Sequence, residues 1–209
     1  MSGVFDPSQQ QGDVDSKIVA ALERVAQALR LQLWEAAQAH RLSPIQVQFV
    51  LFLLFHDPAH CRVSRLAQEF GLTEATVSDA VKSLEGKGLL TRQAWAQDGR
   101  VSLLRLTAKG RRLAQQLSGW ADTLRDHLHS LPSGNKEIVL QFLLQLIAAL
   151  QQAGVISVAR VCLTCAFFEA NVHPNPAAPH HCRLLNQPLA ISALRVDCPD
   201  HQLLLIGSS

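Results

Sequence analysis

Residues 62–110 constrain the fold more than any other part of this 209-residue chain. Two short stretches with apolar residues at helical spacing come first, and Gly71, which tolerates a left-handed backbone, separates them. Two stretches in which apolar and polar residues alternate follow at 89–94 and 101–107, with Gly99 in the polar tip between them. A helix, a turn, a second helix and a hairpin in this order predict a winged helix-turn-helix.

Helical patterns flank this segment on both sides. Residues 15–40 carry one apolar stripe, and Ser43 with Pro44 begins a second, very apolar helix. Thr107 is expected to cap a single helix that continues to about Leu131, where a Pro-Ser-Gly sequence ends it. The chain is therefore expected to be mainly α-helical.

A last helix is expected over 135–152, and it is apolar on two faces. We expect one face to point into the core and the other to form a subunit interface, because a helix this apolar requires two partners. The predicted core face consists of Ile138, Phe142, Leu146 and Ala149, and the predicted outward face consists of Val139, Leu143, Ile147 and Leu150.

The positive charge of the chain is concentrated around the central segment. Residues 62–112 carry 10 Lys/Arg and 5 Asp/Glu, whereas residues 1–61 carry 4 and 6 and residues 113–209 carry 5 and 6. A module that binds duplex DNA needs such an excess, since it must neutralise backbone phosphates. The longest apolar run, 49–55, is too short to span a bilayer, and no secretory signal is visible. We therefore expect a cytoplasmic protein without membrane contact.

The central segment resembles the MarR family of bacterial transcriptional regulators in two sequences, GLTEATVSDAVKSLEGKGLL at 71–90 and DGRVSLLRLTAKG at 98–110. The order of helices extends this resemblance over roughly 15–153. The resemblance implies a homodimer whose first and last helices intertwine and which binds a palindromic operator in double-stranded DNA. The chain has no nucleophile–base pair, phosphate loop or dinucleotide fingerprint, so we expect no enzymatic activity.

The outer face of the second helix in the motif holds the expected contacts with DNA bases. Thr76 and Ser78 carry short hydroxyls suited to base edges or phosphates, and Lys82 is suited to a phosphate or a guanine. Asp79 stands where many members of the family have Arg. A carboxylate there repels phosphate but can accept a hydrogen bond from cytosine N4. The alternative for all four residues is an ordinary solvated helix face.

The hairpin supplies a second set of expected DNA contacts. Asp98 is expected to hold Arg100 by an ion pair at the tip of the hairpin. The resemblance implies that Arg100 approaches the minor groove, whose narrow form attracts a guanidinium. Arg92 and Arg105 are expected to contact the DNA backbone, with a solvent-facing charge as the alternative for each.

Beyond Gly154 the chain is rich in proline and has too little apolar pattern to fold without a covalent cross-link or a bound metal. Cys162 and Cys165 form a CxxC pair, Cys182 follows after 16 intervening residues, and Cys198 follows after 15 more. Thiols stay reduced in the cytosol, so this pattern predicts a metal centre with four thiolate ligands. Regulators of the MarR family end before this region, which makes it an addition to the family pattern.

Three interpretations of the four cysteines stay open. The first is an iron–sulfur cluster, with a 4Fe–4S cluster favoured over a 2Fe–2S cluster, because Pro199 follows the last cysteine and Phe167 and Phe168 lie beside the CxxC pair. The spacing also resembles an expanded pattern of high-potential iron–sulfur proteins. The second is a structural Zn2+ site, in which a histidine can replace a thiolate; the candidates are His173, His180, His181 and His201. The third is a thiol–disulfide switch without metal.

We therefore expect a dimeric transcriptional regulator, acting as a repressor, that senses redox state, oxygen, nitric oxide or iron through an iron–sulfur cluster. One alternative is a MarR-type regulator with structural zinc and a small-molecule ligand. Another is a redox or electron-transfer protein that uses the winged helix for protein contacts. The expected organisation is a disordered tail (1–14), dimerisation and support helices (15–60), the winged helix-turn-helix (61–110), further dimerisation helices (111–154) and a small irregular cysteine-rich tail (155–209).

Overall fold

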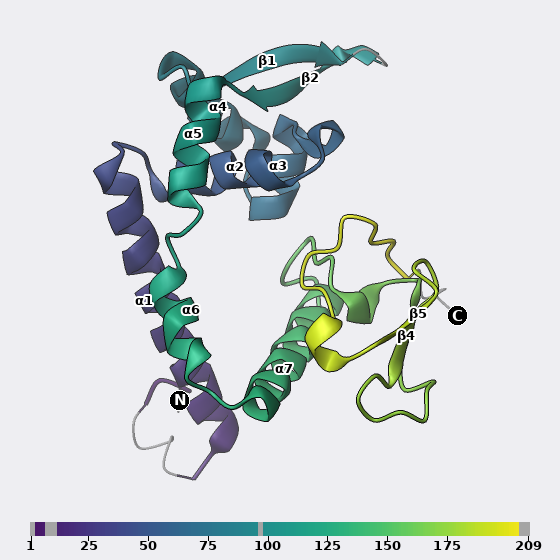
Figure 1. Cartoon of the computed structure of the whole chain (residues 1–209). Helices are drawn as coiled ribbons and strands as arrows, with labels where there is room; N and C mark the ends of the chain where they lie inside the picture. Colours follow the sequence, from purple (N-terminus) through teal and green to yellow (C-terminus); the bar gives the residue numbers. More distant parts are fainter. Residues whose placement is uncertain (1–2, 7–11, 96–97, 205–209) are drawn as a thin grey trace. The chain divides into compact units, whose positions relative to one another are not determined.

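The computed structural model describes residues 3–6, 12–95 and 98–204 (Figure 1). The elements up to residue 152 are α1 (Val14–Ala39), α2 (Pro44–Phe55), η2 (Pro58–His60), α3 (Val63–Phe70), α4 (Glu74–Gly86), β1 (Leu90–Trp95), β2 (Asp98–Leu106), α5 (Ala108–Leu117), α6 (Asp122–His129) and α7 (Ser133–Gln152). Short elements follow: η3 (Cys162–Thr164), β3 (Phe168–Glu169), β4 (His180–Cys182), β5 (Gln187–Leu189) and η4 (Ile191–Ala193). Within the described ranges, no helix is both long and apolar enough to cross a membrane.

The chain forms two compact units. The first consists of Met1–Phe55, Ala80–Thr91 and Leu106–Arg125, and the second of His56–Asp79, Arg92–Arg105 and Asp126–Ser209.

Helix α2 forms the centre of the first unit, where it packs against α1 and α5. It begins at a reciprocal cap, because the Gln46 N–H donates to Ser43 Oγ (3.4 Å) while the Ser43 N–H donates to the Gln46 side-chain oxygen (3.2 Å). Val47, Phe49 and Val50 of this helix are fully buried. The predicted start of α2 at Ser43 and Pro44 is confirmed, and its apolar composition is explained by burial on most sides.

The start of α5 lies directly against the backbone of Leu89. Thr107 caps the helix by accepting a hydrogen bond from the Gly110 N–H (3.0 Å), as the sequence predicts. The Thr107 N–H donates to the Leu89 carbonyl oxygen (3.1 Å). A Cβ added to Gly110 would lie 1.8 Å from that same oxygen, so the close approach of helix and backbone requires glycine here.

The single helix predicted from Thr107 to about Leu131 is wrong. The structure divides it into α5 and α6, with a break over residues 118–121. The Ser118 hydroxyl donates to the Gln115 carbonyl, and the Trp120 N–H donates to the Leu117 carbonyl three residues back, which tightens and ends α5. No proline marks this break, so the hydrophobic pattern alone did not indicate it.

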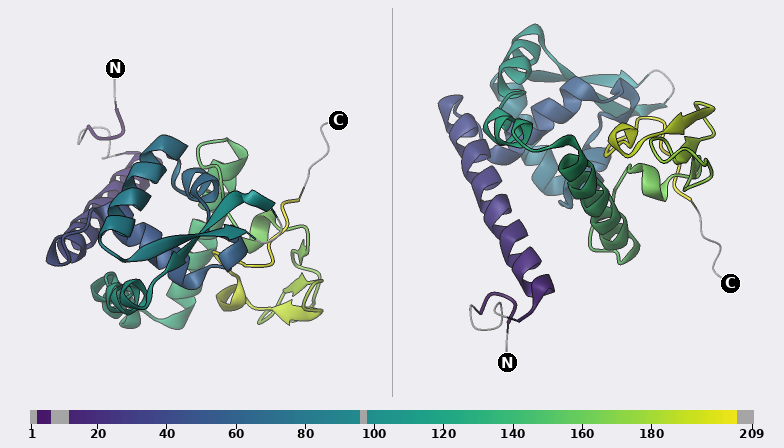
Figure 2. Two further views of the ribbon diagram at one scale, coloured as in Figure 1. Left: turned by 90° about the horizontal axis from the view of Figure 1, so that it is seen from above. Right: turned by 60° about the horizontal axis from the view of Figure 1, so that its bottom comes forward.

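The winged helix-turn-helix has the predicted elements in the predicted order. Gly71 has a φ of +62° and forms the left-handed turn after α3. Val77, Val81 and Leu84 on the inner face of α4 have no exposed surface. The following strands, β1 and β2, pair into a two-stranded sheet, and two further views show them as adjacent ribbons (Figure 2).

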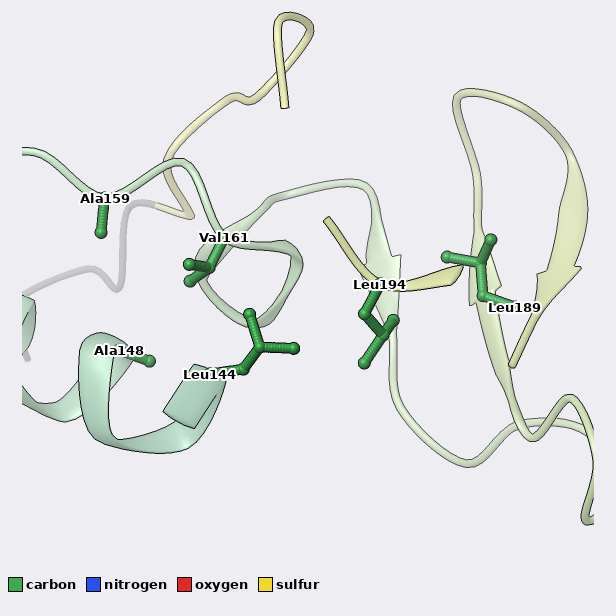
Figure 3. Close-up of a cluster of buried hydrophobic side chains, with 6 residues drawn as sticks. All are labelled: Leu144, Ala148, Ala159, Val161, Leu189 and Leu194. Atoms are coloured by element: carbon green, nitrogen blue, oxygen red, sulfur yellow. The ribbon is translucent and has the colours of Figure 1, made fainter. Parts of the chain in front are cut away.

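Helix α7 and the segment that follows it share one core, which belongs to the second unit. The buried members are Leu144, Ala148, Ala159, Val161, Leu189 and Leu194 (Figure 3). Strands β3, β4 and β5 form a three-stranded antiparallel sheet in this segment, and β5 contributes Leu189 to the core. We call residues 155–204 the cysteine tail.

The predicted core face of α7 is wrong. Ile138 and Phe142, predicted to point inward, are 68% and 38% exposed, whereas the buried residues are Leu144 and Ala148. Ile147, predicted to face outward, packs against the core shared with the cysteine tail. The helix is apolar nearly all round, so its periodicity could not identify the face that the tail covers. It also begins at Ser133, two residues before the predicted start, because Ser133 and Gly134 form its first turn.

Candidate DNA interface and four-cysteine site

The outer face of α4 presents the predicted polar residues to solvent. Thr76, Asp79 and Lys82 are exposed at three-residue spacing, which places them on one face of the helix, and Ser78 is half-buried beside them. The Thr73 hydroxyl accepts a hydrogen bond from the Thr76 N–H (3.2 Å) and lies 2.9 Å from the Thr76 hydroxyl. This cap fixes the first turn of α4, where a reading helix contacts base edges.

The hairpin carries the other predicted DNA contacts. Arg92 is exposed on β1, and Arg105 is half-buried on β2. The Leu104 N–H donates to the Cys61 carbonyl oxygen (2.7 Å), which ties β2 to the residue that precedes α3 by two positions. The side chains of Asp98 and Arg100 lie outside the part of the chain whose side chains the structure describes, so the ion pair between them stays a prediction.

The four cysteines of the tail line one cavity of about 30 Å³. Phe167, Phe168, Leu184 and Leu189 complete most of its wall. An adjoining hollow of about 100 Å³ shares three of the cysteines, which are Cys162, Cys182 and Cys198. The predicted quartet, separated by up to 36 positions in the sequence, is therefore brought together in a pocket with apolar walls.

Backbone hydrogen bonds hold the cysteines in place. The Cys165 N–H donates to the Cys162 carbonyl oxygen (3.0 Å), which makes the CxxC pair a tight turn. Cys182 pairs with Phe168 in the register of β3 and β4. The Cys198 N–H donates to the carbonyl oxygen of Arg160 (3.0 Å). Local turns and strand pairing together orient all four residues toward the cavity.

Arg195 is a functional candidate that the sequence analysis missed. Its backbone N–H donates to Cys162 Sγ (3.2 Å), and its guanidinium Nη1 lies 3.6 Å from Cys198 Sγ. Burial raises the pKa of the Cys162 thiol, the Arg195 N–H lowers it, and the three neighbouring thiols raise it again. Four thiols this close need added positive charge to ionise together, and a metal centre supplies it.

Four thiolates can hold either a single zinc ion or an iron–sulfur cluster. A tetrahedral zinc site, with Zn–S bonds of ~2.3 Å, requires sulfurs about 3.8 Å apart. An iron–sulfur cluster accepts thiolates spread around a larger centre. As the side chains lie, no three Cys, His, Asp or Glu residues within the described ranges are gathered around one point.

The histidines considered as zinc ligands have other neighbours. His173 Nε2 lies 3.0 Å from His181 Nδ1, and His201 Nε2 lies 3.0 Å from the Thr164 hydroxyl. His180 Nδ1 accepts a hydrogen bond from a backbone N–H (3.2 Å). Among the described residues that line the cavity there is no histidine.

Cys61 lies apart from the quartet, as predicted. Its side chain is 2% exposed, and its Sγ lies 3.4 Å from the Asp57 carbonyl oxygen. Burial raises the pKa of this thiol to about 11, although the nearby charge of Arg105 lowers it and Asp57 raises it further. A raised pKa disfavours the thiolate, which is the form of cysteine that binds metals.

Comparison with known proteins identifies the fold. Residues 41–101 match the model of the MarR family. The transcriptional regulator PA3341 is 26% identical, with a TM-score of 0.57 over 65% of this chain and 98% of that one. Staphylococcus aureus MepR in its DNA-binding conformation is 21% identical, with a TM-score of 0.57 over 64% and 98%, and MepR in a DNA complex is 22% identical, with 0.55 over 63% and 96%.

Proposed function

We propose that this chain, whose winged helix-turn-helix is of the MarR family, is a homodimeric DNA-binding transcriptional regulator. The observation that carries the proposal is the capped, exposed polar face of α4 within the most basic segment of the sequence. The fold shared with MepR, which has been solved in complex with DNA, adds support. A helix of this kind reads the major groove, while the basic side chains around it neutralise phosphates.

Exposed apolar side chains on the first and last helices support the homodimer. On α1, Leu31 and Trp34 are 62% and 52% exposed, and on α7, Ile138 and Val139 are 68% and 43% exposed. Helices that present such residues to water usually bury them against a partner. Two copies would also place two reading helices on one duplex, as a palindromic operator requires.

Fluorescence anisotropy with a duplex selected by the protein from a random library tests DNA binding. We expect Lys82→Ala to weaken binding and to reduce the slope of log affinity against log salt by about one, because one phosphate contact is lost. Lys17→Ala, a matched change at an exposed position in the first turn of α1, should leave both quantities unchanged. No binding at low ionic strength, or equal salt slopes for Lys82→Ala and wild type, contradicts the proposal.

We also propose that Cys162, Cys165, Cys182 and Cys198 bind an iron–sulfur cluster. The support is the shared cavity and its aromatic and aliphatic walls. Such a cluster supplies sensitivity to oxygen, nitric oxide and redox state when bound. The protein's own contribution is to exclude water with Phe167 and Phe168 and to donate the Arg195 N–H to a ligand sulfur.

Anaerobic purification followed by visible absorption and metal analysis tests the cluster. We expect a brown protein that contains iron and acid-labile sulfide, and we expect Cys162→Ser to lose both. Cys61→Ser, a matched change outside the quartet, should retain them. A colourless protein with one zinc per chain would support the structural-zinc alternative, and a metal-free protein would contradict both metal proposals.

A further inference from the structure

A charge network of four side chains connects the cysteine tail to the helix-turn-helix. Arg160 forms a bidentate pair with Glu69 of α3, with Nη1–Oε2 and Nη2–Oε1 distances of 2.8 and 2.9 Å. The Nε of Arg160 donates to one carboxylate oxygen of Asp197, and His56 Nε2 lies 2.8 Å from the other. Glu69 and Arg160 are separated by 91 positions, and both belong to the second compact unit.

The pair between Arg160 and Glu69 is shielded from water. Their side chains are 13% and 17% exposed, whereas an ordinary surface pair such as Arg183 with Glu169 in the tail is 57% and 40% exposed. Shielded charges interact more strongly than exposed ones, and removing one partner leaves the other uncompensated. Bidentate geometry also fixes the direction of the guanidinium, so a displacement of Arg160 also displaces Glu69.

On the tail side, two members of the network, Arg160 and Asp197, lie within two residues of proposed cluster ligands. Arg160 and Asp197 form an isolated parallel β-bridge, and the Cys198 N–H donates to the Arg160 carbonyl oxygen (3.0 Å). Arg160 precedes Cys162 by two residues, and Asp197 immediately precedes Cys198. A shift of Cys162 relative to Cys198 therefore changes the geometry with which Arg160 holds Glu69.

On the DNA-binding side, the network ends at residues that position the reading helix and the hairpin. Glu69 lies in the last turn of α3, two residues before the left-handed Gly71 that leads into α4. His56 lies immediately after α2, and its carbonyl oxygen is 3.9 Å from the thiol of Cys61, whose own carbonyl accepts from Leu104 of β2. Displacing Glu69 therefore moves the turn that sets the start of α4.

We infer that Arg160 is a positioning residue through which occupancy of the four-cysteine site controls DNA affinity, an inference that rests on the proposed function. The filled site holds Cys162 and Cys198 together, keeps Arg160 on Glu69, and fixes the α3–α4 turn. Emptying the site loosens the Arg160–Asp197 bridge, which releases Glu69. The contact between Arg160 and Glu69 thus has a formed and a released state, and occupancy of the four-cysteine site favours the formed one. Such a two-state contact is sufficient to couple the four-cysteine site to DNA binding.

The test measures the affinity of anaerobically reconstituted protein and of chelator-stripped protein for the selected duplex. For wild type we expect the two affinities to differ by at least about fivefold, the lower end of coupling between sites. In Glu69→Gln and Arg160→Gln the ratio should fall to nearly one, while both variants still bind iron and duplex. Arg183→Gln removes an arginine of the tail that does not reach α3, so it should keep the wild-type ratio.

Hydrogen exchange gives a readout that does not depend on DNA. Stripping the metal should speed amide exchange over 63–79 in wild type but not in Glu69→Gln, in which that segment exchanges fast in both states. The same measurement decides the matter if Arg160→Gln fails to fold. A wild-type ratio of one, or a Glu69→Gln ratio equal to that of wild type, overturns the inference while leaving DNA binding and metal binding intact. A protein that binds no duplex or no metal overturns the proposed function as well.

Discussion

The change Gly110→Ala tests the packing of α5 against the backbone of Leu89, the residue before β1. Helix propensity alone predicts a gain of about 1 kcal/mol, because alanine is the better helix former. The structure predicts the opposite, since the new Cβ would lie 1.8 Å from the Leu89 carbonyl oxygen and 2.8 Å from its carbon. Contacts of a Cβ essentially never fall below 3.0 Å, so helix and backbone must separate by more than 1 Å.

The Leu89 carbonyl is not free to move away. Its oxygen accepts hydrogen bonds from the Thr107 N–H (3.1 Å) and hydroxyl (3.3 Å), and the Leu89 N–H donates to Leu84 (3.0 Å). Overpacking of this kind costs about 1–3 kcal/mol, and each weakened hydrogen bond adds ~1 kcal/mol. After the helix-propensity gain, we expect a net loss of about 2 kcal/mol, which lowers the melting temperature by roughly 4–8 °C for a chain of this size.

Thermal melting and urea unfolding check this value against Gly134→Ala. Gly134 lies in the first turn of α7 with open space around its Cβ position, so this control should be neutral or slightly stabilising. Gly110→Ala should also weaken duplex binding more than the control does, because Leu89 and Thr107 flank the two strands of the hairpin. If Gly110→Ala melted at or above the wild-type temperature, the close contact between α5 and Leu89 would be refuted.

Two further predictions concern the cysteines and the tail. Because the pKa of Cys61 is raised from 9.0 to about 11, its thiolate fraction at pH 8 is roughly a hundredfold below that of an ordinary thiol. In chelator-stripped protein, iodoacetamide should label half-buried tail cysteines such as Cys165 and Cys182 first and Cys61 only after unfolding, as mass spectrometry would show. Rapid native labelling of Cys61 would contradict its burial. Leu144→Ala, in the core shared by α7 and the tail, should cost ~2–5 kcal/mol and expose the tail to protease, whereas Val155→Ala at a 68% exposed position should change stability by less than ~0.5 kcal/mol. Equal protease sensitivity of the two variants would argue against the packing of the tail on α7.

Local patterns predicted the parts of the fold that local interactions determine. The caps at Ser43 and Thr107 and the turn at Gly71 follow from hydrogen bonds and backbone angles within a few residues. The break after α5 was missed because hydrogen bonds of the Ser118 hydroxyl and the Trp120 N–H end the helix, without a proline or a change in apolar spacing. The buried face of α7 was missed because the segment that covers it has no periodic pattern of its own.

The candidate sites likewise contain residues that the sequence pattern predicts and residues that it does not. The CxxC pair and the two later cysteines predicted a shared site from their spacing alone. The structure gathers all four around one cavity. The contact between Arg160 and Glu69 leaves no local pattern, since its partners are 91 positions apart and each is an ordinary charged residue in the sequence. Arg195 was missed for a related reason, because its main contribution is a backbone N–H that any residue but proline supplies.

Native mass spectrometry of anaerobically purified protein mixed with the selected duplex tests the central claim most directly. We expect one species that contains two chains, one duplex and an inorganic mass of iron and sulfide on each chain. Single chains without duplex at low ionic strength would contradict the DNA-binding dimer, and a DNA-bound dimer with no inorganic mass would contradict the cluster.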